Sequence, residues 1–154
     1  MPDGHYFSTS STTRISSFRQ VVQNDPDFEW YRASKHTLNY LTQLPVGWDG
    51  HRATAVSLIN AIFALDILKQ ICIEGTPPPH IAPGVNGNCQ LEWHTLNGDL
   101  ELNVKALNQV EVYYSVLSEN PPIEQELTLR NDFTGIVDIL RQITGSAIAH
   151  AAAA

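Results

Sequence analysis

The sequence predicts an α+β fold, in which an antiparallel β-meander of three to four strands packs against a long central helix. Three observations indicate this class. Apolar residues recur at helical spacing through the first half of the chain, and this pattern ends at Gly75 and a run of prolines. From His80 onward apolar and polar residues alternate, which is typical of strands. A last amphipathic segment then predicts a helix after the sheet.

The first half of the chain is expected to contain three helices. Apolar residues recur at helical spacing within 15–22 and again within 28–44. The strongest pattern covers 54–74 and has apolar side chains on nearly all sides. We therefore expect this third helix to lie at the centre, with the sheet on one side and other helices on the other. The segment 44–50, Leu-Pro-Val-Gly-Trp-Asp-Gly, forms the turn that precedes it.

The second half of the chain is expected to form the meander and a closing helix. A short edge strand at 80–83 is limited by its prolines, and Asn97-Gly98 is a hairpin signal. Leu127 and Leu129 are the candidates for a short last strand. The final helix is expected from Phe133 to Thr144, after the capping pair Asn131-Asp132. The inner face is predicted to carry Cys89, Leu91, Trp93, Leu100, Leu102, Val104, Val110, Val112, Tyr114 and Val116.

The domain organisation follows from these patterns. Residues 1–13 are rich in Ser and Thr and are expected to form a flexible arm. Residues 14–146 form a single α+β domain, and the nearly all-alanine tail 147–154 is left out of the fold. A chain of 154 residues is long enough to bury roughly 70% of its unfolded surface.

The charge of the chain argues against nucleic-acid binding, and its low content of charged residues raises the question of whether a partner covers part of the surface. Nine basic and 16 acidic residues give a formal net charge of −7, with no run of Lys or Arg, so direct binding to nucleic acid is not expected. Charged residues are only 16% of the chain, below the usual level of about 25%. Either a partner or second copy covers part of the surface, or Ser, Thr, Asn and Gln replace the missing charges.

The compartment is predicted from the cysteines and from the absence of targeting signals. Cys72 and Cys89 are expected to be buried free thiols in a reducing cytoplasm, although a single disulfide is the alternative. The polar start of the chain shows no signal peptide. The longest apolar stretch, 53–73, is interrupted by polar residues and is not expected to span a membrane.

Three groups of residues are candidates for function. Trp48 with Asp49 is either a partner anchor or a structural pair, in which Asp49 closes a turn or caps a helix and Trp48 packs beneath the sheet. The outward residues of the meander form a polar face, which is either a partner surface, an acid–base site or an ordinary solvated face. This face is predicted to carry Gln90, Glu92, His94, Glu101, Asn103, Lys105, Glu111 and Tyr113. The third group is His51, His80, His94 and Cys89, in which no pair has a recognised metal-ligand spacing, so no metal or other cofactor is expected.

Spaced Leu, Pro, Gly and Trp residues form a longer pattern between 44 and 104. They are Leu44-Pro45, Gly47-Trp48-Asp49-Gly50, Pro78-Pro79, Pro83, Gly87, Leu91-Glu92-Trp93 and Leu100-Glu101-Leu102. This pattern resembles that of a family of small, largely uncharacterised bacterial proteins. The resemblance implies a link to mobile elements or to defence and toxin–antitoxin genes, and it provides no catalytic residue.

The sequence thus predicts a non-enzymatic protein-binding module, acting as an inhibitor, antitoxin-like or adaptor component in a bacterial or phage setting. Binding is expected on the polar face or its edge at 80–83, with Trp48 or the aromatic residues within 28–31 as anchors. The predicted partner-binding residues are Trp48, Asp49, Glu92, His94, Glu101 and Tyr113. The alternative is a small metal-dependent or acid–base hydrolase that uses Glu92, His94 and Glu101. A third hypothesis is a homodimer that buries the low-charge surface.

Overall fold

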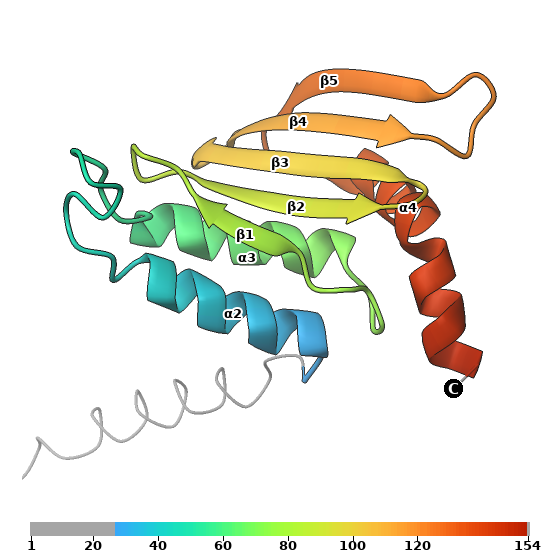
Figure 1. The fold of residues 1–154 in the computed structure, drawn as a ribbon, viewed down its shortest axis with the longest axis horizontal. Helices are drawn as coiled ribbons and strands as arrows, with labels where there is room; N and C mark the ends of the chain where they lie inside the picture. Colours follow the sequence, from blue (N-terminus) through green and yellow to red (C-terminus); the bar gives the residue numbers. More distant parts are fainter. Residues whose placement is uncertain (1–26, 154) are drawn as a thin grey trace, which may run out of the picture.

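The computed structural model describes residues 27–153, with side chains described as far as Gly145. Helices α2 (Glu29–Leu41) and α3 (Leu58–Ile71) precede the sheet, and α4 (Thr134–Ala153) follows it (Figure 1). The strands are β1 (His80–Pro83), β2 (Cys89–Thr95), β3 (Gly98–Ala106), β4 (Gln109–Val116) and β5 (Ile123–Leu129). This order confirms the predicted α+β class. The arm predicted at 1–13 and the helix predicted at 15–22 lie outside the described residues.

The sheet is an antiparallel meander in which the spatial order of the strands equals their order in the chain. Helix α3 contacts β2 and β3, and α4 contacts β3 and β4, while α2 packs on α3 and reaches β1. The described helices therefore cover one face of the sheet (Figure 1). We call the opposite face, which no described helix covers, the outer face.

The core lies between the sheet and the helices, as the period-two pattern predicts. The apolar residues predicted to face inward from β2, β3 and β4 are buried, apart from Tyr114, which is half-buried against the core. In α2, Tyr31, Leu38 and Leu41 are buried at the predicted helical spacing, and Trp30 joins them. Burial of this apolar area is the main free-energy term that holds the two layers together.

The predicted strand count is too low, because the sheet has five strands. β5 is a full strand of seven residues rather than a short addition at Leu127 and Leu129. It pairs with β4 without a shift of register from Ile123 to Leu129. Five of its residues are exposed, so its sequence carries no complete alternation of apolar and polar residues.

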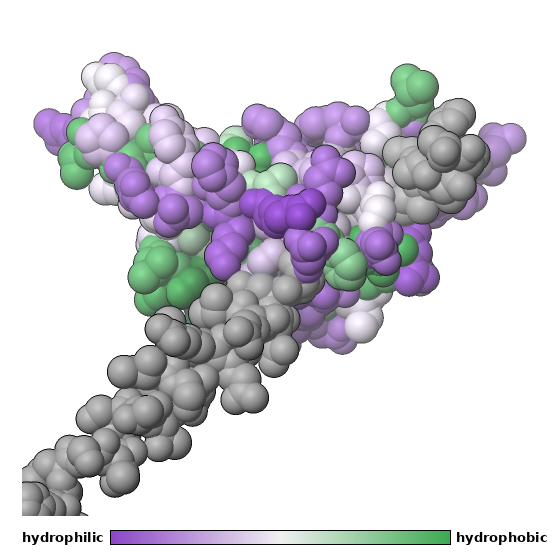
Figure 2. Space-filling model, turned by 90° about the horizontal axis from the view of Figure 1, so that it is seen from below, coloured by the Kyte–Doolittle hydropathy of each residue, from purple (hydrophilic) through white to green (hydrophobic). Residues whose placement is uncertain are grey.

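The prediction of a long central helix at 54–74 is wrong in both length and position. Helix α3 has 14 residues and begins after Ser57, whose side chain accepts a hydrogen bond from the Asn60 backbone N–H at 3.1 Å. Its first turns are open to solvent, since Leu58, Ile59 and Ile62 are 67%, 63% and 54% exposed. Figure 2 shows apolar surface gathered on this helical side, on the left of the view. The helix is therefore covered by the sheet and by its neighbours on one side only.

The closing helix and the thiols complete the fold. Helix α4 starts one residue later than predicted and continues beyond Thr144 to Ala153.

Cys72 and Cys89 are both buried and free, which confirms the expected unpaired thiols. Burial raises the pKa of each thiol to about 12. Within residues 27–153, no helix has the length and apolar content needed to cross a bilayer.

Candidate functional site: the outer face of the sheet

The outer-face side chains line up in three rows that cross the sheet. The central row runs from β1 to β5 through His80, Glu92, Glu101, Tyr113 and Glu126. The two flanking rows are Ala82, Gln90, Asn103, Glu111 and Thr128, and His94, Asp99, Ser115 and Glu124. Directly opposed side chains in such rows lie close enough to interact. The predicted residues Glu92, His94, Glu101 and Tyr113 are thus brought together on one surface.

Negative charge dominates this face. Six carboxylates project from it, namely those of Glu92, Asp99, Glu101, Glu111, Glu124 and Glu126. Besides two histidines, the five strands contain no arginine and one lysine, Lys105, whose amino group lies 2.7 Å from a Glu111 carboxylate oxygen. Among the described residues no ion pair involves Glu101, Glu124 or Glu126. The face therefore carries carboxylates without a charged partner.

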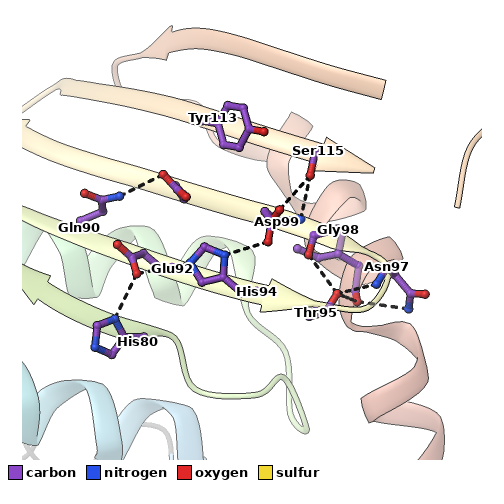
Figure 3. Close-up of polar contacts among 12 residues, drawn as sticks. His80, Gln90, Glu92, His94, Thr95, Asn97, Gly98, Asp99, Tyr113 and Ser115 are labelled. Atoms are coloured by element: carbon purple, nitrogen blue, oxygen red, sulfur yellow. Dashed lines mark hydrogen bonds and ion pairs between the residues drawn. The ribbon is translucent and has the colours of Figure 1, made fainter. Parts of the chain in front are cut away.

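Two histidines and two carboxylates form a connected chain at the β1–β3 side of this face (Figure 3). His80 Nδ1 lies 3.1 Å from Glu92 Oε2, and the same oxygen is 3.5 Å from His94 Nε2. On its other side, His94 Nδ1 is 2.8 Å from Asp99 Oδ1. The hydrogen bond with Asp99 raises the pKa of His94, partial burial opposes this, and Glu92 adds to the increase. Protonation of His94 is therefore favoured in the folded state.

A shallow trough occupies the β2–β5 side of the outer face. It has a volume of about 460 Å³ and is lined by residues of β2, β3, β4 and β5. Glu101, Glu111 and Glu126 line it together with the ring of Tyr113. The Tyr113 hydroxyl donates a hydrogen bond to Glu124 at 3.2 Å, and Gln90 Nε2 donates to Glu101 at 3.1 Å. The trough is thus an acidic groove with one aromatic side chain in its wall.

Ser115 contributes a hydroxyl group to the outer face beside Asp99. Ser115 is buried, and its hydroxyl donates to Asp99 Oδ2 at 3.2 Å and accepts from the Asp99 N–H at 3.2 Å. The hydroxyl is thus paired with a carboxylate and a backbone amide rather than with the imidazole base that would activate it. Among the described residues, no group of three His, Cys, Asp or Glu side chains is placed to hold a metal ion.

Trp48 and Asp49 lie elsewhere, in the connection between α2 and α3. The expectation that Trp48 packs beneath the sheet is wrong, because Trp48 is half-buried and is not part of the core. Its indole N–H donates to the Thr54 carbonyl at 2.9 Å. Asp49 Oδ1 accepts from the backbone N–H groups of His51 and Ala53 at 2.9 and 3.1 Å. The pair therefore shapes a loop, as its structural interpretation predicts.

Two other elements were expected to take part in binding, the aromatic residues within 28–31 and the edge at 80–83. Trp30 and Tyr31 are buried in the core, so they are not exposed anchors. The edge at β1 is short, ends at Pro83 and lies beside α2. The other edge of the sheet is β5, at the top of Figure 1.

Four titratable residues of the outer face were not among the residues predicted for the polar face: His80, Asp99, Glu124 and Glu126. Asp99 has the same parity as Glu101, so the alternation of β3 was sufficient to place it. Glu124 and Glu126 alternate with Leu127 and Leu129 in the same way, once β5 is known to be a full strand.

Comparisons of this chain with protein-family models, with curated proteins and with solved structures find no match. A functional assignment therefore rests on the geometry of the outer face.

Proposed function

We propose that this chain is a non-enzymatic protein-binding module that recognises a basic partner with the outer face of its sheet. The observation that carries the proposal is the open face itself. It presents six carboxylates, one lysine and two histidines around an acidic trough. Complementary charge on a partner would accelerate the encounter and fix its orientation.

The negative charge of the outer face and the tyrosine on it also support a protein as the partner. A surface of this charge repels the phosphates of nucleic acids, which favours a protein partner. Tyr113 offers an aromatic contact beside Glu101 and Glu126, and tyrosine is enriched at the energetically important positions of interfaces. We further propose a cytoplasmic role as an inhibitor, antitoxin-like or adaptor component in a bacterial or phage setting. The buried free thiols Cys72 and Cys89 fit a reducing compartment.

A charge-neutralising variant tests the placement of the site. The outer-face variant is Glu101→Gln, Glu124→Gln and Glu126→Gln, whose carboxylates have no ion-pair partner among the described residues. Its matched control, Asp66→Asn, Glu74→Gln and Asp138→Asn, removes the same charge from exposed positions in or next to the helices. Both variants should keep the wild-type circular dichroism spectrum.

The assay is affinity capture from the native host with all three proteins, followed by titration calorimetry with the purified partner. Each exposed charge contact is worth about 0.2–1 kcal/mol, so the loss of three should weaken binding roughly tenfold. The control should bind like the wild type. Equal affinity of the outer-face variant and the wild type would exclude the outer face as the binding site.

A further inference from the structure

Within residues 27–153, β5 has a strand partner on one side only. It is the last strand of the sheet and pairs only with β4. Among the described residues, no backbone hydrogen bond outside the sheet involves 123–129. In an antiparallel strand, the N–H and C=O groups of every second residue point to the same side. Alternate residues of β5 therefore present donors and acceptors to solvent in the geometry that another strand would satisfy.

Several features that normally block such an edge are absent from β5. It contains no proline and no lysine, and its register with β4 has no bulge. The opposite edge is less suited to this role, because β1 has only four residues, ends at Pro83 and has α2 beside it. Of the two edges, β5 is the one that can accept a strand of useful length.

The side chains of β5 specify what such a strand would carry. Glu124, Glu126 and Thr128 face outward, opposite Ser115, Tyr113 and Glu111 of β4. The alternate positions, which include Ile123, Leu127 and Leu129, face the helical side, and the two leucines are half-buried. A strand added to β5 would place every second side chain beside the glutamates and the others beside the leucines.

We propose that a partner docks by adding an extended strand to β5, with basic residues on the outer face and apolar residues on the inner face. The inference rests on the proposed function and names its binding mode. Main-chain hydrogen bonds to β5 provide affinity, and the alternating side chains provide specificity. The added basic residues pair with Glu124 and Glu126, which have no ion-pair partner among the described residues.

Charge argues against a second copy of this chain as the occupant. Antiparallel pairing of two β5 strands with full overlap of 123–129 places Glu126 against the same residue of the other copy. Like charges directly opposite each other destabilise strand pairing. The glutamates thus oppose self-association at this edge while they favour a basic strand.

Three short peptides test the mode of binding. The first is a capped seven-residue peptide that alternates lysine with valine. The second and third have the same sequence but carry N-methyl groups either on all lysines or on all valines, which removes alternate backbone donors without changing the charge. Affinities are measured by calorimetry, and hydrogen exchange of the β5 amides is followed by NMR.

Strand addition predicts a selective result. The parent peptide binds, one N-methylated peptide binds at least tenfold more weakly, and the other retains its affinity, because only one set of donors faces β5. Every second amide of β5 exchanges more slowly in the complex. Glu124→Gln and Glu126→Gln each weaken binding roughly two- to fivefold, whereas Asp66→Asn does not.

The outcomes separate this inference from the proposed function. Equal affinity of all three peptides, or no binding of the parent peptide, overturns strand addition at β5. In both cases the proposed function stands if partner capture still depends on the outer-face carboxylates. A shift to a dimer in light scattering without peptide, with β5 amides protected, would assign the edge to a second copy and overturn the inference.

Discussion

Replacement of Asn60 should test how the first turn of α3 is joined to the sheet. Asn60 is 6% exposed, and its side-chain amide donates to the Gly87 carbonyl at 2.8 Å and to the Lys105 carbonyl at 3.3 Å. One side chain thus connects a helix, the β1–β2 loop and the end of β3. Asn60→Leu keeps the approximate volume but removes both hydrogen bonds.

The expected loss of stability depends on which hydrogen bonds the Gly87 and Lys105 carbonyl groups keep in the variant. A hydrogen bond contributes about 0.5–1.5 kcal/mol net, so the loss of two gives about 1–3 kcal/mol. The Gly87 carbonyl keeps a second donor, the Ser57 N–H at 3.0 Å, and the bond to Lys105 is long. We therefore expect the free energy of unfolding to fall by about 1–2 kcal/mol.

Urea unfolding followed by tryptophan fluorescence measures this change as a lower midpoint with an unchanged slope. Asn39→Leu, at an exposed position of α2, is the control and should stay within about 0.5 kcal/mol of the wild type. If Asn60→Leu is as stable as this control, the amide does not hold the three elements together. The reasoning from buried hydrogen bonds would then be wrong.

Three further predictions concern the core, the histidine chain and the thiols. Leu102→Ala, at a fully buried position of β3, should lower the free energy of unfolding by about 2–5 kcal/mol in the same urea assay. Asp99→Asn should lower the pKa of His94 in an NMR titration, because the hydrogen bond with Asp99 is the main cause of its increase; an unchanged pKa would refute this. Since the folded-state pKa of His94 is the higher one, its stabilising contribution is complete below the unfolded value and is lost as the pH rises through the folded value. Cys72 and Cys89 should react with a thiol reagent at pH 8 only after unfolding, and fast reaction of the native protein would contradict their burial.

Elements with one buried face could be predicted from the sequence. Alternation runs through most of β2, β3 and β4 because each strand packs one face on the helices, and the inward apolar residues are those that the pattern indicates. The length of β5 was underestimated because most of its residues, on both faces of the strand, are exposed. Its glutamates and Gln125 are exposed, so burial does not impose a period on its composition.

Local polar contacts also explain why the predicted start of the third helix is wrong. The apolar pattern at 54–74 extends before the true helix, but Thr54 bridges to Asn86 and its N–H donates to the Val85 carbonyl. The helix begins only after Ser57 supplies its side chain as a cap. The exposure of Ile59 and Ile62 depends on the packing of the other elements, which hydropathy alone does not specify. The outer-face site follows from alternation, while its open edge follows from the three-dimensional order of the strands.

The sequential order of the five strands has a consequence for how the chain folds. Every strand pair joins neighbours in the sequence, so the sheet can grow one hairpin at a time without a long crossover. The entropy of loop closure is therefore small for each step compared with a sheet of shuffled order. Since β5 pairs only with β4, it can open without breaking any other strand pair. We expect β5 to be the least protected strand in native-state hydrogen exchange and to join the sheet late.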